Sequence, residues 1–176
     1  FLARRDAFAG TSIHKILGSL NMLQVYRVSE GVENIENNYA TFDACHQLFQ
    51  QNKIVLIFSE GRCINEWHLR PLKKGTARIA LNVWEDHIPL TILPLGINYS
   101  SFRSYGKNVV LNFGDTISKK DIEQDHSPAI PLRTFNNILQ SQLEKLVYEI
   151  DAGDTAKLKR YFYLKQSFAK KILLFF

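Results

Sequence analysis

The five residues Ile-Val-Leu-Ile-Phe at 54–58 form a continuous apolar run, and this run constrains the fold of the 176-residue chain more than any other feature. Polar residues lie on both sides of it, and it ends at Ser59-Glu60-Gly61. A strand that is apolar at every position, rather than at alternate positions, is typical of a central strand covered on both faces. The run therefore predicts a buried strand with helices packed on each side of its sheet.

Helix-like and strand-like patterns alternate along the rest of the chain. Apolar residues recur at the spacing of a buried helix face in residues 13–20, 39–49, 77–84 and 135–150, and strand-like apolar runs occupy residues 22–26, 90–97 and 109–113. Ser118-Lys119-Lys120-Asp121 has the pattern of a capping box that opens a short helix. This alternation predicts an α/β fold with a mostly parallel mixed sheet flanked by helices. We place that domain at residues 1–150 and a helical tail at 151–176.

The net charge of +5 comes from the tail alone. Residues 155–176 carry six of the 22 basic residues and no acidic one, which leaves 16 basic against 17 acidic residues elsewhere. A near-neutral body disfavours a nucleic-acid partner. The tail has the pattern of a basic amphipathic helix, which predicts binding to a membrane surface on the cytoplasmic side. The alternative is that this helix packs on the domain with its lysines in solvent.

Several common kinds of site are missing from the sequence. It contains no GxGxxG, P-loop, GxSxG or HExxH pattern, and its two cysteines, Cys45 and Cys63, form no CxxC pair. These absences argue against a dinucleotide site, a P-loop kinase, a nucleophile elbow and a zinc site. No stretch reaches the roughly 18 apolar residues of a membrane-spanning helix.

Charged residues gather after the predicted buried strand. Glu60 and Gly61 follow the strand directly, Arg62 comes next, and Lys74 begins the segment before the next predicted helix. Arg27 follows the preceding predicted strand. Glycine lets a ligand approach the backbone closely, and arginine is a planar donor for phosphate oxygens. Because ligands bind beyond the carboxyl ends of strands in such sheets, these residues predict a phosphate-binding corner beside one carboxylate.

The run Phe58-Ser59-Glu60-Gly61 resembles the Phe-Pro-Glu-Gly motif of the glycerolipid acyltransferases, the family of 1-acylglycerol-3-phosphate acyltransferases. Residues 1–31 resemble the family's second block, residues 58–80 its third, and residues 88–99, with Leu-Pro-Leu-Gly at 93–96, its fourth. Two substitutions depart from the third block, since Ser59 replaces a proline and Arg62-Cys63 replaces a hydroxyl residue followed by arginine.

The resemblance implies transfer of a fatty acyl group from a thioester donor, acyl-coenzyme A or acyl carrier protein, to a lysophosphatidate-like acceptor. It implies that Arg27 and Arg62 hold the acceptor phosphate and that Lys74 supports the pocket. Glu60 would accept hydrogen bonds from glycerol hydroxyls or organise the arginines, beside Gly61. No metal or redox cofactor is implied, and the thioester is a co-substrate.

The family's first block, His-x-x-x-x-Asp, holds the catalytic base, and no histidine of this chain has an aspartate five residues later. The resemblance places that block before residue 1. We therefore expect the chain to be a fragment without a catalytic residue and inactive by itself. Two alternatives stay open, namely an acyltransferase for another lipid acceptor and a non-enzymatic peripheral lipid-binding module.

Overall fold

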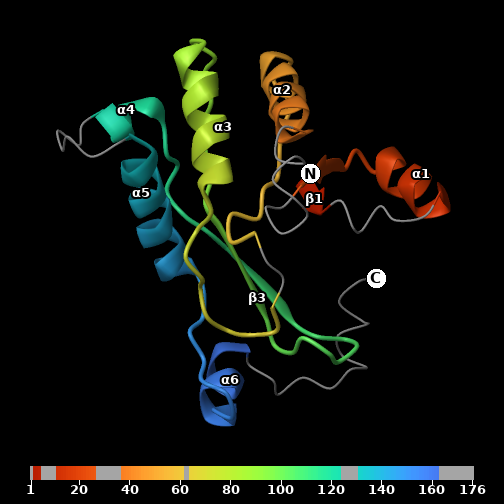
Figure 1. Ribbon diagram of the computed structural model, residues 1–176. Helices are drawn as coiled ribbons and strands as arrows, with labels where there is room; N and C mark the ends of the chain where they lie inside the picture. Colours follow the sequence, from red (N-terminus) through yellow and green to blue (C-terminus); the bar gives the residue numbers. More distant parts are fainter. Residues whose placement is uncertain (1, 5–10, 27–36, 62–63, 124–130, 163–176) are drawn as a thin grey trace. The chain divides into compact units, whose positions relative to one another are not determined.

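The computed structural model describes residues 2–4, 11–26, 37–61, 64–123 and 131–162 (Figure 1). Its helices are α1 (Thr11–Ser19), α2 (Asn37–Gln50), α3 (Lys74–Glu85), α4 (Lys119–Glu123), α5 (Pro131–Leu146) and α6 (Thr155–Phe162). Its strands are β1 (Leu2–Arg4), β2 (Leu23–Val25), β3 (Leu95–Tyr99) and β4 (Val109–Phe113).

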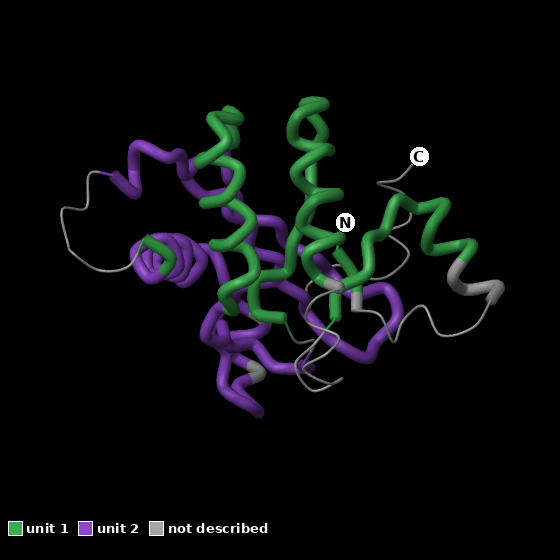
Figure 2. Tube along the Cα trace, turned by 45° about the horizontal axis from the view of Figure 1, so that its top comes forward, with its two compact units in different colours: residues 1–61, 73–90, 130–132 green, residues 62–72, 91–129, 133–176 purple. Residues whose placement is uncertain are grey.

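The chain divides into two compact units (Figure 2). Unit 1 comprises Phe1–Gly61, Lys73–Leu90 and Ile130–Leu132, and unit 2 comprises Arg62–Leu72, Thr91–Ala129 and Arg133–Phe176.

In unit 1, two parallel strands and an extended segment support a helix pair. β1 pairs with β2 in parallel, with Leu2 opposite Leu23, and the Leu2 amide donates to the Leu56 carbonyl at 3.1 Å, which places residues 53–58 beside β1. The core centres on Cys45 of α2 and on Ile79 and Val83 of α3. Packed against it are Leu2, Leu23, Phe42, Phe49, Val55, Ile57, Ile88 and Leu90. The predicted helices at 39–49 and 77–84 are confirmed.

The buried strand predicted at 54–58 is wrong for the described chain. Residues 53–58 are extended without forming a regular strand, and only Val55 and Ile57 point into the core. Ile54 is 96% exposed and Phe58 54% exposed. Side chains of an extended segment alternate between two faces, and the described part of unit 1 covers one of them. The buried face predicted for residues 13–20 is also wrong at two positions, because Ile16 of α1 and Leu20, directly after that helix, are each 58% exposed.

In unit 2, the antiparallel pair β3–β4 lies on the C-terminal end of α5. A Cβ atom added at Gly96 of β3 would lie 2.5 Å from the Leu146 carbonyl oxygen, so only glycine allows this approach. Asn98 and Asn112 each donate from Nδ2 to that same oxygen, at 2.9 and 2.8 Å. The last carbonyls of a helix lack partners within the helix, and the two asparagines satisfy one of them. The predicted strand at 90–97 in fact begins at Leu95, after Pro94.

The short helix α4 begins as its sequence predicts. The Asp121 carboxylate accepts hydrogen bonds from the Ser118 amide and hydroxyl, both at 2.7 Å. These two bonds lower the pKa of the Asp121 carboxyl from its ordinary value. The capping box is therefore confirmed.

The first part of the predicted tail packs on unit 2. Tyr161 of α6 stacks on Tyr148 with ring centroids 4.4 Å apart, and Phe162 is 4% exposed. Asn108 donates to the Phe162 carbonyl at 3.2 Å. Residues 163–176 lie outside the described residues, so membrane binding by the tail stays a prediction, as does a domain boundary at residue 150. None of the described helices is both long and apolar enough to cross a membrane.

The α/β class predicted from the sequence is confirmed. The described residues form two sheets of two strands each, one parallel and one antiparallel, together with several helices. The mostly parallel character predicted for the sheet is not found among them. That prediction depended on residues 54–58 and 90–97 as full strands, and the described structure shortens or loses both.

Candidate functional site

A tight turn at residues 58–61 joins the extended segment to the start of α3. The Gly61 amide donates to the Phe58 carbonyl at 3.1 Å, and the Lys73 amide donates to the Ser59 carbonyl at 2.8 Å. Gly61 has a φ of +65°, in the left-handed region that favours glycine. The turn therefore places Glu60-Gly61 next to Lys73, although eleven residues separate Gly61 from Lys73 in the sequence.

A second bond fixes the turn to the helix itself. The hydroxyl oxygens of Ser59 and Thr76 lie 2.9 Å apart, and both residues are half-buried. Thr76 lies in the first turn of α3. Because one bond holds the backbone and another holds the side chain, the Glu60 turn and the beginning of α3 form one local structure.

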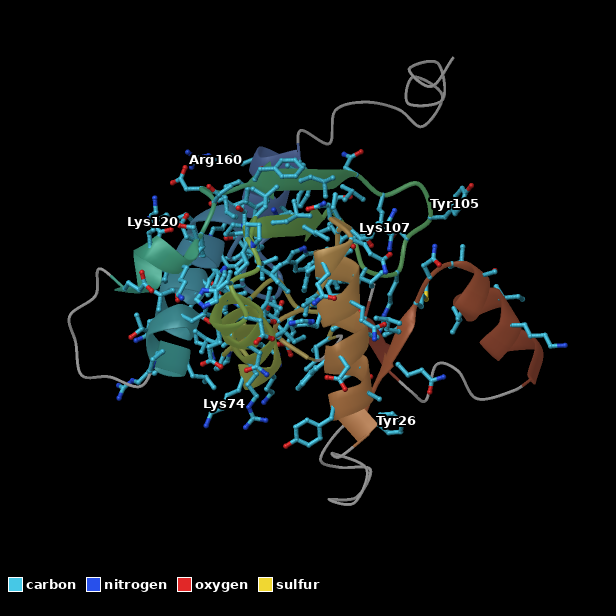
Figure 3. All side chains as sticks on the ribbon, turned by 90° about the horizontal axis from the view of Figure 1, so that it is seen from above. Tyr26, Lys74, Tyr105, Lys107, Lys120 and Arg160 are labelled. Carbon is cyan, nitrogen blue, oxygen red and sulfur yellow. The ribbon has the colours of Figure 1, made fainter. Side chains whose placement is uncertain are left out.

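The beginning of α3 favours a negative group. Its N-cap residue, Lys73, makes no side-chain capping bond, and the first turn contains no acidic residue. Lys74 is the first residue of the helix, and its side chain is exposed (Figure 3). The amides and dipole of a helix N-terminus attract anions, and a lysine beside them adds a full positive charge. The half-buried Glu60 supplies a hydrogen-bond acceptor on the adjoining turn.

Three of the five predicted site residues, Glu60, Gly61 and Lys74, therefore fall in this one local structure. Arg27 and Arg62 lie outside the described residues, and their phosphate role stays a prediction. Strand β2 ends at Val25, two residues before Arg27. Tyr26 there accepts a hydrogen bond from Asn38 Nδ2 at 3.0 Å and donates its amide to Asn38 Oδ1 at 2.8 Å, next to the start of α2 (Figure 3).

Two other side chains of unit 1 that could serve as functional groups, those of His46 and Cys45, lie away from this turn. His46 Nε2 and an Asp86 carboxylate oxygen lie 2.7 Å apart at the far end of α3, about 17 Å along a helix of this length. Their pairing therefore joins α2 to α3. Cys45 is fully buried, and desolvation raises the pKa of its thiol to about 11, which makes it unreactive. No cluster of metal-binding side chains is found among the described residues.

Sequence reasoning missed the residues that hold the turn in place. In the sequence, Ser59 stands out only as a replacement for the proline of the motif, and Thr76 is not among the predicted site residues. Lys73 is not among the predicted site residues either. The signal available in the sequence was a hydroxyl residue directly after an apolar run and another in the next helix start.

A family model described as acyltransferase matches residues 1–98, more than half of the chain. The matched region includes β1, β2, the turn at 58–61 and all of α3. The chain therefore belongs to the acyltransferase family, which confirms the resemblance described above.

One curated relative carries a name that specifies an acceptor. Over 90 residues the chain is 32% identical to glycerol-3-phosphate O-acyltransferase 1 of Saccharomyces cerevisiae. The aligned region covers 47% of this chain and 12% of the yeast protein. The chain thus spans only a small part of that relative's length. No solved structure matches the chain.

Proposed function

We propose that the full-length protein transfers a fatty acyl group from a thioester donor, acyl-coenzyme A or acyl carrier protein, to a hydroxyl of a phosphorylated glycerol acceptor. Membership of the acyltransferase family supports the acyl transfer. The observation that carries the choice of acceptor is the joined structure of the Glu60 turn and the α3 start. It places Glu60 on a turn that is joined to a helix N-terminus without a side-chain cap, where Lys73 and Lys74 add positive charge. This combination suits a ligand with both hydroxyl and phosphate groups.

Each side chain has a distinct role in this proposal. Lys74 and the first amides of α3 attract the acceptor phosphate, together with Arg27 and Arg62. Glu60 accepts a hydrogen bond from a glycerol hydroxyl that does not react. Gly61 keeps the backbone free of a side chain where the acceptor approaches.

In the reaction, an acceptor hydroxyl oxygen attacks the thioester carbon. A new ester C–O bond forms, the C–S bond breaks, and the proton of the hydroxyl passes through a general base to the leaving thiolate. We assign that base to no residue of this chain. The family resemblance supplies a histidine and an aspartate for it, and their expected place is before residue 1.

Two acceptors share the required chemistry. Lysophosphatidate is the acceptor that the motif resemblance favours, whereas the name of the yeast relative specifies glycerol 3-phosphate. The two molecules have the same phosphate and differ by one acyl chain. We favour a lysophosphatidate-like acceptor and include both in the test.

Thiol release from acyl-coenzyme A, and from acyl carrier protein in parallel, tests the proposal on the full-length protein. It is measured without acceptor, with glycerol 3-phosphate and with lysophosphatidate. Acceptor-dependent release with either compound supports the proposal, and the better acceptor identifies the substrate. If neither acceptor causes thiol release from either donor, the proposal is overturned, and a lipid-binding module remains as the alternative.

The variant Glu60→Gln tests the site directly. A hydrogen bond to a charged group contributes roughly 1.5–3 kcal/mol, so we expect kcat/KM for the acceptor to fall about tenfold or more. Glu144→Gln is the matched control, since the Glu144 carboxylate accepts a hydrogen bond from Gln140 of its own helix, α5. Equal activity of the two variants would contradict the role of Glu60.

Membrane association on the cytoplasmic side is also part of this proposal. The support is the charge pattern of residues 155–176, with six basic residues and no acidic one. Sedimentation of the full-length protein with vesicles, with and without anionic lipid, measures it. Removing residues 163–176 should weaken binding to anionic vesicles. Unchanged binding would show that this part of the tail does not contribute.

A further inference from the structure

The turn at residues 58–61 has a second position that suits proline. The bond from the Gly61 amide to the Phe58 carbonyl makes Ser59 the second residue of a β-turn and Glu60 the third. Ser59 and Glu60 both have negative φ, and Gly61 has a φ of +65°. In a turn of this kind, proline is favoured at the second position because its ring fixes φ, and glycine is favoured at the fourth.

Serine leaves this second position without the restraint of a ring. Ser59 stands where the motif Phe-Pro-Glu-Gly has its proline. Among the described residues the Ser59 amide donates no hydrogen bond, so a proline would remove none of their bonds. Phe58 is extended, the conformation that proline favours in the residue before it. The turn is therefore compatible with proline, yet in this chain its φ is not fixed covalently.

Thr76 supplies a restraint of another kind. Its hydroxyl oxygen lies 2.9 Å from that of Ser59, and both residues are half-buried, which limits competition from water. Thr76 is the third residue of α3, so this bond ties the turn to the start of the helix in unit 1. A Cβ atom added at Gly75, between Lys74 and Thr76, would meet nothing within 4 Å. The bond thus holds the turn without filling the space beside the helix start.

We propose that Thr76 is a positioning residue for acceptor binding, and that its hydrogen bond with Ser59 takes the place of the proline ring in the family motif. The bond holds Glu60 on a fixed turn beside the α3 start before the acceptor arrives. A turn that is already ordered requires less ordering when the acceptor binds. This inference rests on the proposed function and extends it to Thr76, to which that function assigns no role.

Kinetics of the full-length protein with Thr76→Val and Thr76→Ser test the positioning role. Valine keeps the shape of threonine and lacks the hydroxyl. Because one neutral hydrogen bond is lost, Thr76→Val should raise KM for the acceptor about threefold to fivefold, with KM for the donor unchanged. Thr76→Ser keeps a hydroxyl and should stay within about twofold of the unmodified protein. An unchanged acceptor KM in Thr76→Val would overturn the proposal.

Ser100→Ala is the matched control for the loss of a half-buried hydroxyl. The Ser100 hydroxyl accepts a hydrogen bond from the Asn108 amide at 2.9 Å, in the connection between β3 and β4. Its removal should lower the free energy of unfolding about as much as Thr76→Val does, and urea denaturation measures both losses. The acceptor KM should not change in Ser100→Ala. An equal rise in the two variants would show a general effect of lost stability and would overturn the proposal.

The variant Ser59→Pro tests whether the bond and the ring are interchangeable. It restores the ring and removes the hydroxyl partner of Thr76, so its acceptor KM should lie within about twofold of the unmodified value. In this background, adding Thr76→Val should have no further effect, because the bond that it removes is already absent. The same rise from Thr76→Val with proline as with serine at residue 59 would overturn the interchange. A large rise in Ser59→Pro alone would also overturn it.

Urea denaturation shows first whether Ser59→Pro folds. If this variant does not fold, Ser59→Ala is combined with Thr76→Val in its place. The two changes remove the two partners of one bond, so the double variant should have the acceptor KM of either single variant. A rise equal to the product of the two single effects would overturn the role of the bond.

The two proposals fail in different ways. If the unmodified full-length protein transfers no acyl group to any acceptor, the proposed function is refuted, and acceptor positioning by Thr76 is refuted with it. If the unmodified protein is active and Thr76→Val leaves the acceptor KM unchanged, the proposed function stands and this inference fails.

Discussion

The hydroxyl groups of Ser59 and Thr76 lie 2.9 Å apart and join the Glu60 turn to the first turn of α3. The same turn is joined to the helix start by the Lys73 amide, which donates to the Ser59 carbonyl at 2.8 Å. Ser59 therefore uses both its backbone and its side chain to hold Glu60 beside Lys73. A proline in its place would keep the carbonyl and lose the hydroxyl.

The Ser59–Thr76 bond should show as a coupling energy in a double-mutant cycle. A typical hydrogen bond inside a protein contributes about 1 kcal/mol, so Ser59→Ala and Thr76→Ala should each lower the free energy of unfolding by roughly that amount. The double variant should lose less than the sum of the two. Urea denaturation of the three variants measures this, with Thr76→Ser, which keeps a hydroxyl, as the control. Fully additive losses would show that the bond does not contribute.

The left-handed backbone conformation of Gly61 predicts that alanine is destabilising at this position, in contrast to alanine at a glycine inside a helix. At a φ of +65° an added Cβ would lie 3.0 Å from Lys73 Cγ, so Gly61→Ala combines a strained backbone with a tight contact. We expect a loss of about 1–2 kcal/mol in the free energy of unfolding. Gly18→Ala in α1 is the matched control, because nothing lies within 4 Å of its added Cβ.

In a helix, alanine is favoured over glycine by up to about 1 kcal/mol, so the control should be neutral or stabilised. Thermal or urea unfolding of both variants checks the comparison. Equal stability of Gly61→Ala and Gly18→Ala would contradict the left-handed conformation of the turn.

Lys74 should contribute to acceptor affinity through its charge. In the full-length protein, Lys74→Ala should raise KM for the acceptor about threefold, since exposed charge interactions contribute under about 1 kcal/mol. The effect should shrink at high salt, which screens exposed charges. Lys120→Ala, at an exposed lysine of α4, is the control (Figure 3). A similar rise in both variants would show a general charge effect rather than a site at α3.

The Glu149 carboxylate predicts a loss of stability in acid. Partial burial raises the pKa of its carboxyl. Hydrogen bonds from the Leu69 amide and His68, together with the nearby charges of His68 and Lys157, lower this pKa by more than burial raises it, so the net shift is to below 4.5. A depressed folded-state pKa stabilises the folded protein above the unfolded value of 4.5, and this contribution is lost as the pH falls through the folded pKa.

Urea denaturation of the protein and of Glu149→Gln across pH 3 to 7 measures this effect. The protein should be more stable than the variant at neutral pH, and the difference should shrink below about pH 4.5. A difference that stays constant down to pH 3 would show that the ionised carboxylate is not the stabilising group.

The helices were the easiest part of this structure to predict. Ala77, Ala80 and Trp84 recur at helical spacing, and all three are buried on α3. The capping box at Ser118 and Asp121 was equally visible, because both partners lie within four residues. Interactions between residues that are close in the sequence can be predicted without knowing the rest of the fold.

Residues 54–58 show where such prediction fails. Their composition is apolar throughout, yet Ile54 is 96% exposed while Val55 and Ile57 contact the core. The apolar character of a residue shows only that it can be buried. Whether a second layer covers the other face depends on which segments pack there, and a local pattern does not contain that information.

The sequence by itself determined the helices of the chain, its family and the position of Glu60-Gly61 after an apolar segment, because each of these depends on short-range pattern. Only the tertiary structure decided that Ser59 would bond to Thr76 and that Glu149 would hold His68 and the Leu69 amide. These pairs are 17, 81 and 80 residues apart, and closing such distances requires the packing of each unit as a whole. Local patterns choose the elements, and burial of their apolar faces chooses which distant side chains meet.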